Sequence, residues 1–563
     1  MNILGLSCYY HDSAACIICD GVLVAAAQEE RFNRIKNSSD FPINAINFCV
    51  QQAGISFDQI DYVAFYEKPF LKFSRVILDI VSKFPFSYGS FIRNTPQWLQ
   101  DRLILPGVLK REFAYKGDVL FIPHHHAHAA STFFVSPFDE AAILINDGVG
   151  EYSTSSIGFG SGKNIDLQKQ INYPDSLGLL YSAITTFLGF NANSGEGTTM
   201  ALASFGQVNY LEQFKKIINI APDGSYTLNQ KYFSLNKRKR MYSKDLITLL
   251  GAPRKFDTDY DQRHKDIAAT LQFVIEDCLI KQSKYAYNTF GSENLCLAGG
   301  VFLNCVANQK ILEQTKFKKI FIQPGAGDAG ASIGAAFFTY NSILGNERKF
   351  VMNHAYFGPE STDKEIEIAL NAKSLKFNKY EEQTLLEIVT ERIIAKKTVG
   401  WFQGRLEFGP RALGNRSILA SAQDSVMTEI LNSRIKHREW FRPFAPIVKK
   451  EKANDYFKML ADSPFMLLAP KVIEKMKTII PAVTHIDGTA RTQTVDKETN
   501  PLLWKLLDVH EKKTGISVII NTSFNLKAEP IVCKPAEAII DYLNSEMDCL
   551  ALGNYFIEKH DEI

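Results

Sequence analysis

A run of histidines is the densest group of metal-binding side chains in this sequence. His124-His125-His126-Ala127-His128 contains four of the chain's 11 histidines. If a helix begins here, His124 and His128 share one face with Cβ atoms ~5–6 Å apart, so both imidazoles can bind one divalent ion. Asp147 and Asp328, in glycine-rich turns, could add oxygen ligands, a set that suits iron, manganese or zinc better than calcium. The alternative is a polar helix start that happens to be rich in histidine.

Two further polar turns carry groups that could act on a substrate. His11-Asp12 lies between apolar segments, and a histidine with a pKa near neutrality can take a proton from an alcohol. Taken alone, a histidine in such a turn is more typical of a solvated surface residue. Gly195-Glu196-Gly197-Thr198-Thr199-Met200 could contact substrate or phosphate, or could be a plain connecting loop.

Cationic side chains gather late in the chain and predict a phosphate site. The segment Arg405–Arg442 carries seven of them against four acids, interleaved with Gly-Pro-Arg and Phe-Arg-Pro-Phe phrases: Arg405, Arg411, Arg416, Arg434, Lys436, Arg438 and Arg442 against Glu407, Asp424, Glu429 and Glu439. Arginine offers forked donors that match phosphate oxygens. Arg491 and Ser523 lie in similar polar loops at strand ends, although ordinary turn chemistry also explains these two.

Strands and glycine turns must position these groups. Apolar runs at Ile3–Leu6 and Ala14–Ile18 flank the His11 turn, and Ala141–Ile145 and Ser153–Phe159 flank the Asp147 turn. This repetition suits a duplicated nucleotide-binding architecture, because glycine turns let backbone N–H groups approach phosphate.

The rest of the chain alternates helices and strands. A helix is expected over Asp266–Thr289, ending at Gly291, and a buried strand then runs into Gly299-Gly300. The pattern lapses around Leu344–Thr362. Beyond it we expect a second α/β domain, with helices at Glu382–Lys396 and Val426–Lys436 and strands at Thr398–Phe402 and Ile516–Ile520.

Composition excludes several classes of protein. The chain has 563 residues, 46% hydrophobic and 22% charged, with a formal net charge of +2 that steers it neither to nucleic acid nor to a membrane surface. The basic run Lys237–Arg240 is expected to be a solvated loop. We find no signal peptide or membrane span, and the nine scattered cysteines indicate a reduced, cytoplasmic setting. Cys16 and Cys19 form C-x-x-C, but on a strand they point to opposite faces.

These phrases together resemble the O-carbamoyltransferase family that includes the nodulation-factor, cephem and tobramycin carbamoyltransferases. The match runs in order through GLSCYYHDSAA, QEERFNRIK, YEKP, HHHAHAAS, SLGLLYSAITTFLGF, GEGTTM, LAGGVFLN, GRLEFGPRALGNRSILA, FRPFAP, DGTARTQTV and NTSFN. It implies an α/β protein with a duplicated actin/hexokinase-like (Kae1-like) domain at residues 1–355. That domain is close to the threonylcarbamoyl-adenylate-using tRNA-modification proteins. A YrdC-like α/β domain follows at residues 356–563.

The resemblance also implies a biosynthetic, ATP-dependent O-carbamoylation. The second domain would convert carbamoyl phosphate and ATP, the latter with Mg²⁺, into a carbamoyl adenylate, and the first would transfer the carbamoyl group to a small-molecule hydroxyl. His124, His128, Asp147 and Asp328 would hold the metal, iron in similar enzymes, and His11 would be the base. The implied adenylate-binding residues are Gly299, Gly300 and Asn304. Arg411, Lys436, Arg442, Arg491 and Ser523 would line the carbamoyl phosphate and ATP site, with Lys436, Arg491 and Ser523 also catalytic.

The sequence departs from the family pattern at two places. The glycine loop lacks the lysine that often follows its second glycine, which bears on acceptor recognition near Thr198, and Ala528 stands where many relatives have glycine. Three rival functions share some of these motifs. They are a non-catalytic nucleotide-binding protein, a sugar kinase and a threonylcarbamoyl transferase acting on tRNA. The low net charge disfavours the tRNA-modifying transferase. The sequence identifies neither the acceptor nor the oligomeric state, and it is compatible with a homodimer.

Overall fold

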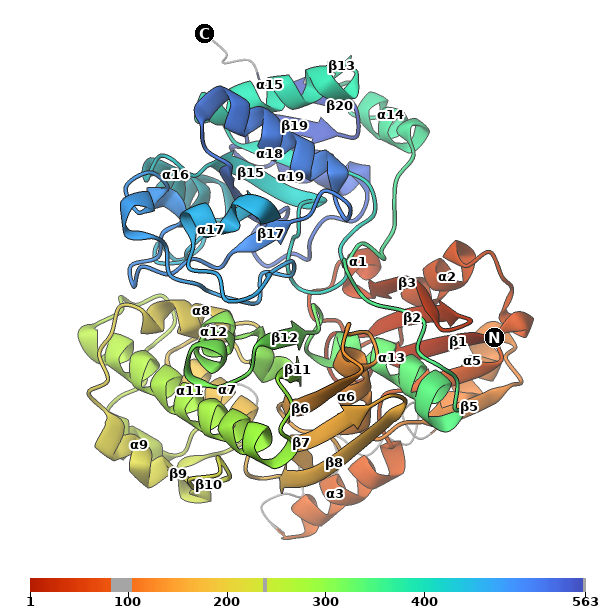
Figure 1. The fold of residues 1–563 in the computed structure, drawn as a ribbon, viewed down its shortest axis with the longest axis vertical. Helices are drawn as coiled ribbons and strands as arrows, with labels where there is room; N and C mark the ends of the chain where they lie inside the picture. Colours follow the sequence, from red (N-terminus) through yellow and green to blue (C-terminus); the bar gives the residue numbers. More distant parts are fainter. Residues whose placement is uncertain (83–103, 236–239, 560–563) are drawn as a thin grey trace.

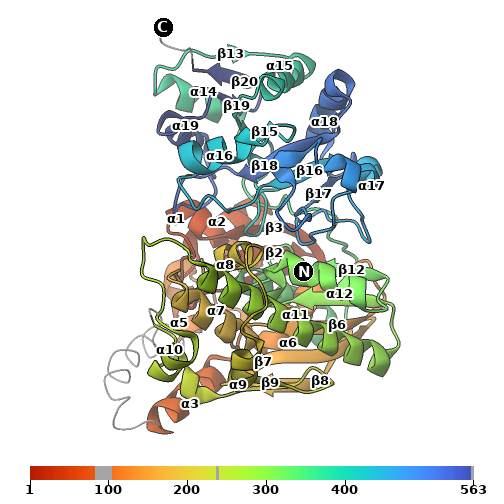
Figure 2. The same cartoon turned by 90° about the vertical axis from the view of Figure 1, so that its left-hand side faces the viewer.

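The structure is a computed structural model that describes residues 1–82, 104–235 and 240–559 (Figure 1). Most of the basic run expected to form a solvated loop, residues 237–239, lies outside the described residues. We call residues 1–343 the N-terminal part and residues 363–559 the C-terminal part. Seen from two sides, the C-terminal part lies over the N-terminal part along the long axis (Figures 1 and 2).

The first sheet of the N-terminal part has five strands in the order β3-β2-β1-β4-β5. They are β1 (Asn2–Ser7), β2 (Ala14–Cys19), β3 (Val22–Gln28), β4 (Tyr62–Phe65) and β5 (Asp118–Phe121). β1 pairs antiparallel with β2 and parallel with β4, with Ile3 opposite both Ile18 and Tyr62. The His11 turn connects β1 to β2, as the apolar pattern predicts.

The second sheet repeats this topology. Its strands are β6 (Glu140–Asn146), β7 (Ser153–Ser161), β8 (Asn164–Asn172), β11 (Asn294–Ala298) and β12 (Lys319–Ile322). In the order β8-β7-β6-β11-β12, three antiparallel strands are followed by two parallel ones, as in the first sheet. The duplicated, actin/hexokinase-like α/β fold is therefore confirmed.

Two helices packed against each other separate the sheets and carry candidate site residues at their N-terminal ends. α6 (His124–Phe133) contacts the second sheet and α13 (Asp328–Phe337) the first. A Cβ on Gly334 would overlap the carbonyl oxygen of Ala127, so glycine permits this close approach of the helices.

The remaining helices surround the sheets. They are α1 (Glu30–Asn33), α2 (Ile43–Gln52), α3 (Pro69–Ser82), α5 (Leu105–Phe113), α7 (Leu177–Phe187), α8 (Glu196–Ala203), α9 (Leu211–Ile217), α10 (Lys244–Leu250), α11 (Gln262–Phe290) and α12 (Cys305–Gln314), besides a small hairpin of β9 (Ile218–Ile220) and β10 (Tyr226–Leu228). α11 begins four residues before the predicted Asp266, because the Asp261 side chain caps it by accepting a hydrogen bond from the His264 N–H. Gly291 ends it in a left-handed conformation, as predicted.

The C-terminal part is built on an eight-stranded sheet in the order β13-β20-β19-β14-β15-β18-β16-β17. Its strands are β13 (Asn378–Lys379), β14 (Val399–Phe402), β15 (Arg416–Ser421), β16 (Ala445–Lys449), β17 (Gln493–Val495), β18 (Val518–Ser523), β19 (Cys549–Leu552) and β20 (Tyr555–Glu558). Its helices are α14 (Asp363–Asn371), α15 (Glu382–Ile394), α16 (Val426–Ile430), α17 (Ala453–Tyr456), α18 (Pro501–Thr514) and α19 (Pro535–Leu543).

One predicted helix of this part is wrong in detail. Val426–Lys436 was expected as a single helix, but α16 changes to a π-helical turn at Leu431–Ile435. Lys436 ends that turn with its side chain directed inward.

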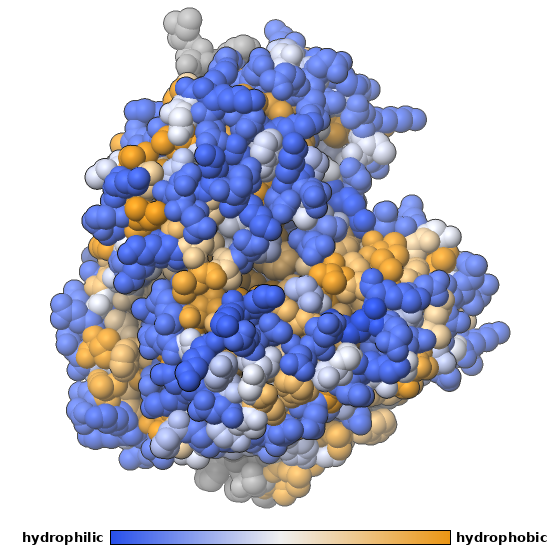
Figure 3. All heavy atoms as spheres, in the orientation of Figure 1, coloured by the Kyte–Doolittle hydropathy of each residue, from blue (hydrophilic) through white to orange (hydrophobic). Residues whose placement is uncertain are grey.

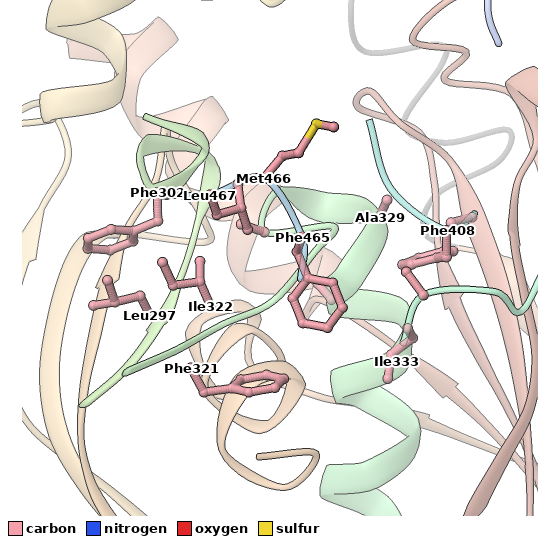
Figure 4. Close-up of a cluster of buried hydrophobic side chains, with 14 of the residues drawn as sticks. Leu297, Phe302, Phe321, Ile322, Ala329, Ile333, Phe408, Phe465, Met466 and Leu467 are labelled. Atoms are coloured by element: carbon pink, nitrogen blue, oxygen red, sulfur yellow. The ribbon is translucent and has the colours of Figure 1, made fainter. Parts of the chain in front are cut away.

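A continuous apolar core joins the two parts. Phe408, Phe465, Met466 and Leu467 of the C-terminal part pack against the end of the second sheet and the start of α13 (Figure 4). The Phe465 and Phe321 rings meet edge to face with centroids 6.2 Å apart. The face seen in Figure 3 is largely hydrophilic, with apolar residues gathered where the parts meet. In the part of the chain that the structure describes, no helix combines the length and apolar character of a membrane span.

Candidate functional site

Four predicted metal-binding residues come together between the two sheets. His124 and His128 lie on the first two turns of α6, Asp147 directly follows β6, and Asp328 opens α13. His124 Nε2 lies 3.1 Å from His128 Nε2 and 3.2 Å from Asp147 Oδ2, and His128 Nε2 lies 3.5 Å from Asp328 Oδ1. All four side chains are buried, and one candidate ligand atom from each lies within 4.8 Å of the others. We call this set the His–Asp cluster.

The His–Asp cluster fits a divalent transition metal. Asp328 Oδ1 is buried and accepts no hydrogen bond from any described residue. Bonds of ~2.0–2.2 Å would place neighbouring ligand atoms about 3.4 Å apart in a tetrahedral site, close to the separations above. Burial alone would raise the pKa of Asp147, but the hydrogen bond with His124 and the charge of His128 hold it well below its usual value. An ionised carboxylate is the form that binds a metal.

A carboxylate that sequence reasoning missed holds α6 in place. Proline at the N-cap offers no side-chain acceptor, and Glu151 instead accepts the His124 N–H at 3.0 Å and the Lys68 N–H at 2.7 Å. An anion at a helix N-terminus also complements the helix dipole. The other histidines are not in the cluster: His125 Nδ1 lies 2.6 Å from Ser156 Oγ, and the His126 ring packs on Phe338.

The predicted glycine pair lies beside Asp147. Gly299 has φ +99°, and a Cβ there would overlap the Asn146 carbonyl, so this position requires glycine. The Gly300 N–H donates to Asp147 Oδ1 at 3.0 Å. Asn304 caps α12 by accepting the Ala307 N–H.

The amide of Asn304 also exchanges hydrogen bonds with a second amide that sequence reasoning missed. Gln272 donates to Asn304 Oδ1 at 3.1 Å and accepts from Asn304 Nδ2 at 2.9 Å. Gln272 lies on the buried face of α11, where nothing in the sequence distinguishes it from a core position.

His11 lies in the field of the His–Asp cluster. Its Nδ1 is 3.0 Å from Asp12 Oδ2, and its ring packs on Tyr10. Burial alone would lower the pKa of His11, but the charge of Asp328 and the contact with Asp12 outweigh it and raise the pKa to about 9. His11 is therefore charged at neutral pH when no cation offsets these carboxylates.

Five cations, a buried lysine and four half-buried arginines, form a second cluster on the side of the C-terminal part that faces the N-terminal part. This cationic cluster consists of Arg411, Lys436, Arg438, Arg442 and Arg491. Burial lowers the pKa of every member, and cationic neighbours lower it further for all but Arg491. Cations gathered this closely, two of them arginines (Arg411 and Arg491) whose buried Nε atoms donate to no described residue, favour an anionic ligand.

Lys436 and Ser523, both predicted for this site, are in contact. The Lys436 ammonium donates to the Ser523 carbonyl and, at 2.8 Å, to both the Asn525 carbonyl and Asn525 Oδ1. Ser523 is the last residue of β18, at the strand end expected for it.

Residues of the N-terminal part complete the surroundings of the cationic cluster. Arg442 Nη1 donates to Thr198 Oγ1 at 2.8 Å, and Arg411 Nη2 reaches the Leu303 carbonyl at 3.4 Å. The segment Gly195–Met200 is not the loop expected: α8 begins at Glu196, and Thr198 lies in its first turn.

One short turn connects the two clusters. The 3₁₀ turn Gly300–Leu303 donates to Asp147 at its first residue, and its last residue accepts from Arg411. Gly300 and Leu303 are three steps apart along this 3₁₀ helix, a rise of about 6 Å. The two clusters therefore contact opposite ends of the same turn and do not open on separate faces of the molecule.

Comparisons with known proteins identify the family of this chain. A family described as "Carbamoyltransferase N-terminus" matches residues 2–337, and one described as "Carbamoyltransferase C-terminus" matches residues 390–559. An uncharacterized protein of Synechocystis sp., sll1178, is 43% identical over 99% of this chain and 97% of its own length. Nodulation protein NolNO of Sinorhizobium fredii is 34% identical over 98% of this chain and 79% of its own length.

A third relative extends the match. Nodulation protein U of Rhizobium tropici is 28% identical over 93% of this chain and 91% of its own length. Both halves of the family thus match in order, and the relatives span nearly the whole chain. The protein belongs to the carbamoyltransferase family and is a carbamoyltransferase.

Proposed function

We propose that this carbamoyltransferase moves the carbamoyl group of carbamoyl phosphate, through an ATP-derived carbamoyl adenylate, to a hydroxyl of a small molecule. The observation that carries the proposal is the Gly300–Leu303 turn, which contacts the His–Asp cluster at one end and the cationic cluster at the other. A mixed carbamoyl–phosphoryl anhydride hydrolyses easily in water, so making and using it at two sites joined by one short turn would limit its loss.

The cationic cluster is suited to the first half-reaction. Water cleaves carbamoyl phosphate to carbamate and phosphate. A carbamate oxygen then attacks the α-phosphorus of ATP, which is bound with Mg²⁺, and pyrophosphate leaves. Arg411, Arg442 and Arg491 would neutralise the phosphate oxygens, and Lys436 with Ser523 would hold the carbamoyl phosphate.

The N-terminal part is suited to the second half-reaction. Gly299, Gly300 and Asn304 would lie along the adenylate. His11 would take the proton of the acceptor hydroxyl, whose oxygen attacks the carbamoyl carbon, and AMP leaves. A divalent metal, iron by the resemblance, would be held by His124, His128, Asp147 and Asp328 and would supply Lewis-acid stabilisation of developing charge. The nine free cysteines support a reducing, cytoplasmic setting for this reaction.

The first half-reaction can be tested without knowing the acceptor. The protein is incubated with carbamoyl phosphate, ATP and Mg²⁺, and the nucleotide and phosphate products are separated. Pyrophosphate release that depends on carbamoyl phosphate supports adenylate formation. ADP formation in its place contradicts it.

A variant separates the two stages. Arg491→Ala is expected to abolish pyrophosphate release while the protein still consumes supplied carbamoyl adenylate in an extract containing the acceptor. The product is then identified as the metabolite that gains one carbamoyl group. Equal loss of both steps would show that Arg491 does not belong to the first stage.

A further inference from the structure

Helix α1 belongs to the N-terminal part but contacts loops of the C-terminal part. It lies at the boundary between the parts in both views (Figures 1 and 2). Arg34 follows it in a left-handed conformation, with its N–H donating to the Glu30 carbonyl. This ending directs the Arg34 side chain toward residues nearly 500 positions away in the sequence.

The Arg34 guanidinium donates to two adjacent backbone carbonyls of the C-terminal part. Nη1 donates to the Ile531 carbonyl at 2.7 Å, Nη2 donates to the Pro530 carbonyl at 2.9 Å, and Nη1 also lies 3.2 Å from Glu537 Oε2. The forked donor geometry fixes direction as well as distance. The side chain is 26% exposed, so it is not part of a closed core.

The bound carbonyls belong to a closed loop, residues 524–532. The Val532 N–H donates to the Phe524 carbonyl at 2.9 Å and joins the loop ends. Inside it, Asn525 Nδ2 donates to the Glu529 carbonyl at 2.7 Å. Holding residues 530 and 531 therefore also holds the side chain of Asn525.

Among the described residues, Asn525 of this loop supplies two of the four acceptors that hold the Lys436 ammonium, and Ser523 at the end of β18 supplies the other two. Ser523 Oγ in turn donates to Asn525 Oδ1 at 2.7 Å. A displaced loop would carry this ammonium away from the rest of the cationic cluster.

We propose that Arg34 is a positioning residue for the first half-reaction: it holds loop 524–532 so that Lys436 faces the anionic substrate. The inference rests on the proposed function, because it assigns Arg34 to that same site without contact to substrate. The segment after α1 is also attached to the His11 turn, through the Ser13 N–H to Ser38 carbonyl and Tyr9 N–H to Ser39 carbonyl hydrogen bonds, both 2.9 Å. One segment thus supports both half-sites.

The test compares variants of the full-length protein. Arg34→Met removes the fork and keeps the length of the side chain. We expect the KM for carbamoyl phosphate in pyrophosphate release to rise about tenfold or more, the equivalent of roughly one lost charge-assisted hydrogen bond. Arg34→Lys keeps the charge beside Glu537 but not the fork, so it should recover part of the loss.

Two measurements exclude a general structural effect. Arg392→Met removes a bidentate pair with Glu558 elsewhere in the C-terminal part, at 2.7 and 2.8 Å, and should leave the KM unchanged. Metal binding at the His–Asp cluster should also be unchanged in Arg34→Met. If Arg392→Met raises the KM as much as Arg34→Met does, or if Arg34→Met also loses metal binding, the positioning role is wrong.

A double-mutant cycle gives the decisive result. Binding of carbamoyl phosphate is measured by calorimetry for Arg34→Met, Lys436→Met and the double variant. Because Arg34 is proposed to act through Lys436, the double variant should bind no more weakly than Lys436→Met alone. Additive losses would overturn the proposal. This cycle needs no turnover, so an absence of pyrophosphate release in the unmodified protein would refute the proposed function and leave the role of Arg34 decidable.

Discussion

The charge on His11 links the base to the carboxylates around it. A general base must be neutral to accept a proton. Burial lowers the pKa of His11, but the charges of Asp328 and Asp12 outweigh this effect and raise the pKa to about 9, so that the ring is charged at neutral pH. The same carboxylates that raise this pKa include a candidate metal ligand. A cation bound there would oppose their field and make the neutral imidazole available at physiological pH.

The titration of His11 is therefore expected to depend on metal. Without metal the ring should be charged below about pH 9 and neutral above it, and Zn²⁺ should lower its pKa toward neutrality. NMR of ¹⁵N-labelled histidine checks this, with His11→Asn to assign the signal. An identical His11 titration with and without Zn²⁺ would contradict the electrostatic link.

A second prediction at the residue scale compares two histidines of α6, His128 and His126. His128→Ala removes one candidate ligand and should weaken Zn²⁺ or Fe²⁺ binding by more than the ~10–100-fold typical of losing an outer-shell partner. His126→Ala, on the same helix but packed on Phe338, is the matched control and should bind metal normally. Metal content is measured after dialysis. Equal content in the wild-type, His128→Ala and His126→Ala proteins would show that the His–Asp cluster does not bind the metal.

Among the elements, loop 524–532 carries a strained residue. Ala528 has φ +67°, a left-handed conformation that costs a residue with a Cβ roughly 1–2 kcal/mol. Ala528→Gly should therefore raise the free energy of unfolding by about 1 kcal/mol in urea denaturation. Ala369→Gly, inside α14, should lower it by a similar amount. Destabilisation by Ala528→Gly would show that the alanine methyl makes contacts that outweigh the strain.

Local patterns predicted the elements that carry the His–Asp cluster. The four-residue spacing of His124 and His128 needs only the helical repeat, and the turns after β1 and β6 follow from apolar runs bounded by glycine and acid. Propensity did not reveal that Leu431–Ile435 becomes a π-helical turn that ends at the buried Lys436.

Partners distant in sequence were beyond prediction. Glu151 supports α6 and Arg34 holds loop 524–532 only because the fold brings these segments together. Nothing in the local composition distinguishes such a glutamate or arginine from a solvated one. The cationic cluster could be anticipated because its arginines lie among prolines and phenylalanines, but its contacts to Thr198 and Leu303 could not.

In the whole molecule, the junction between the two parts is both a core and a site. The Phe408–Gly409 segment packs on the Pro324–Gly325 turn that leads to Asp328. A Cβ on Gly325 would lie 2.9 Å from Phe408 Cε1, and one on Gly409 would lie 2.9 Å from the Pro324 carbonyl oxygen. Packing this close leaves little freedom for the parts to separate. In the proposed reaction, the stability of the junction should therefore govern whether the carbamoyl adenylate made by one part reaches the other.

Phe465→Ala tests this dependence. Phe465 is buried against Phe321 across the junction, and its truncation should cost about 3–5 kcal/mol by leaving a cavity where the two parts meet. We expect calorimetry to show the C-terminal part unfolding before the N-terminal part. In the proposed reaction, AMP release without acceptor should also rise, because the loosened junction admits water that hydrolyses the carbamoyl adenylate to carbamate and AMP. Phe256→Ala, at a side chain 74% exposed, should change neither. The Phe465→Ala protein could show separated unfolding transitions and still retain the adenylate as the wild type does. That result would mean that the intermediate is protected within one part and not by the junction.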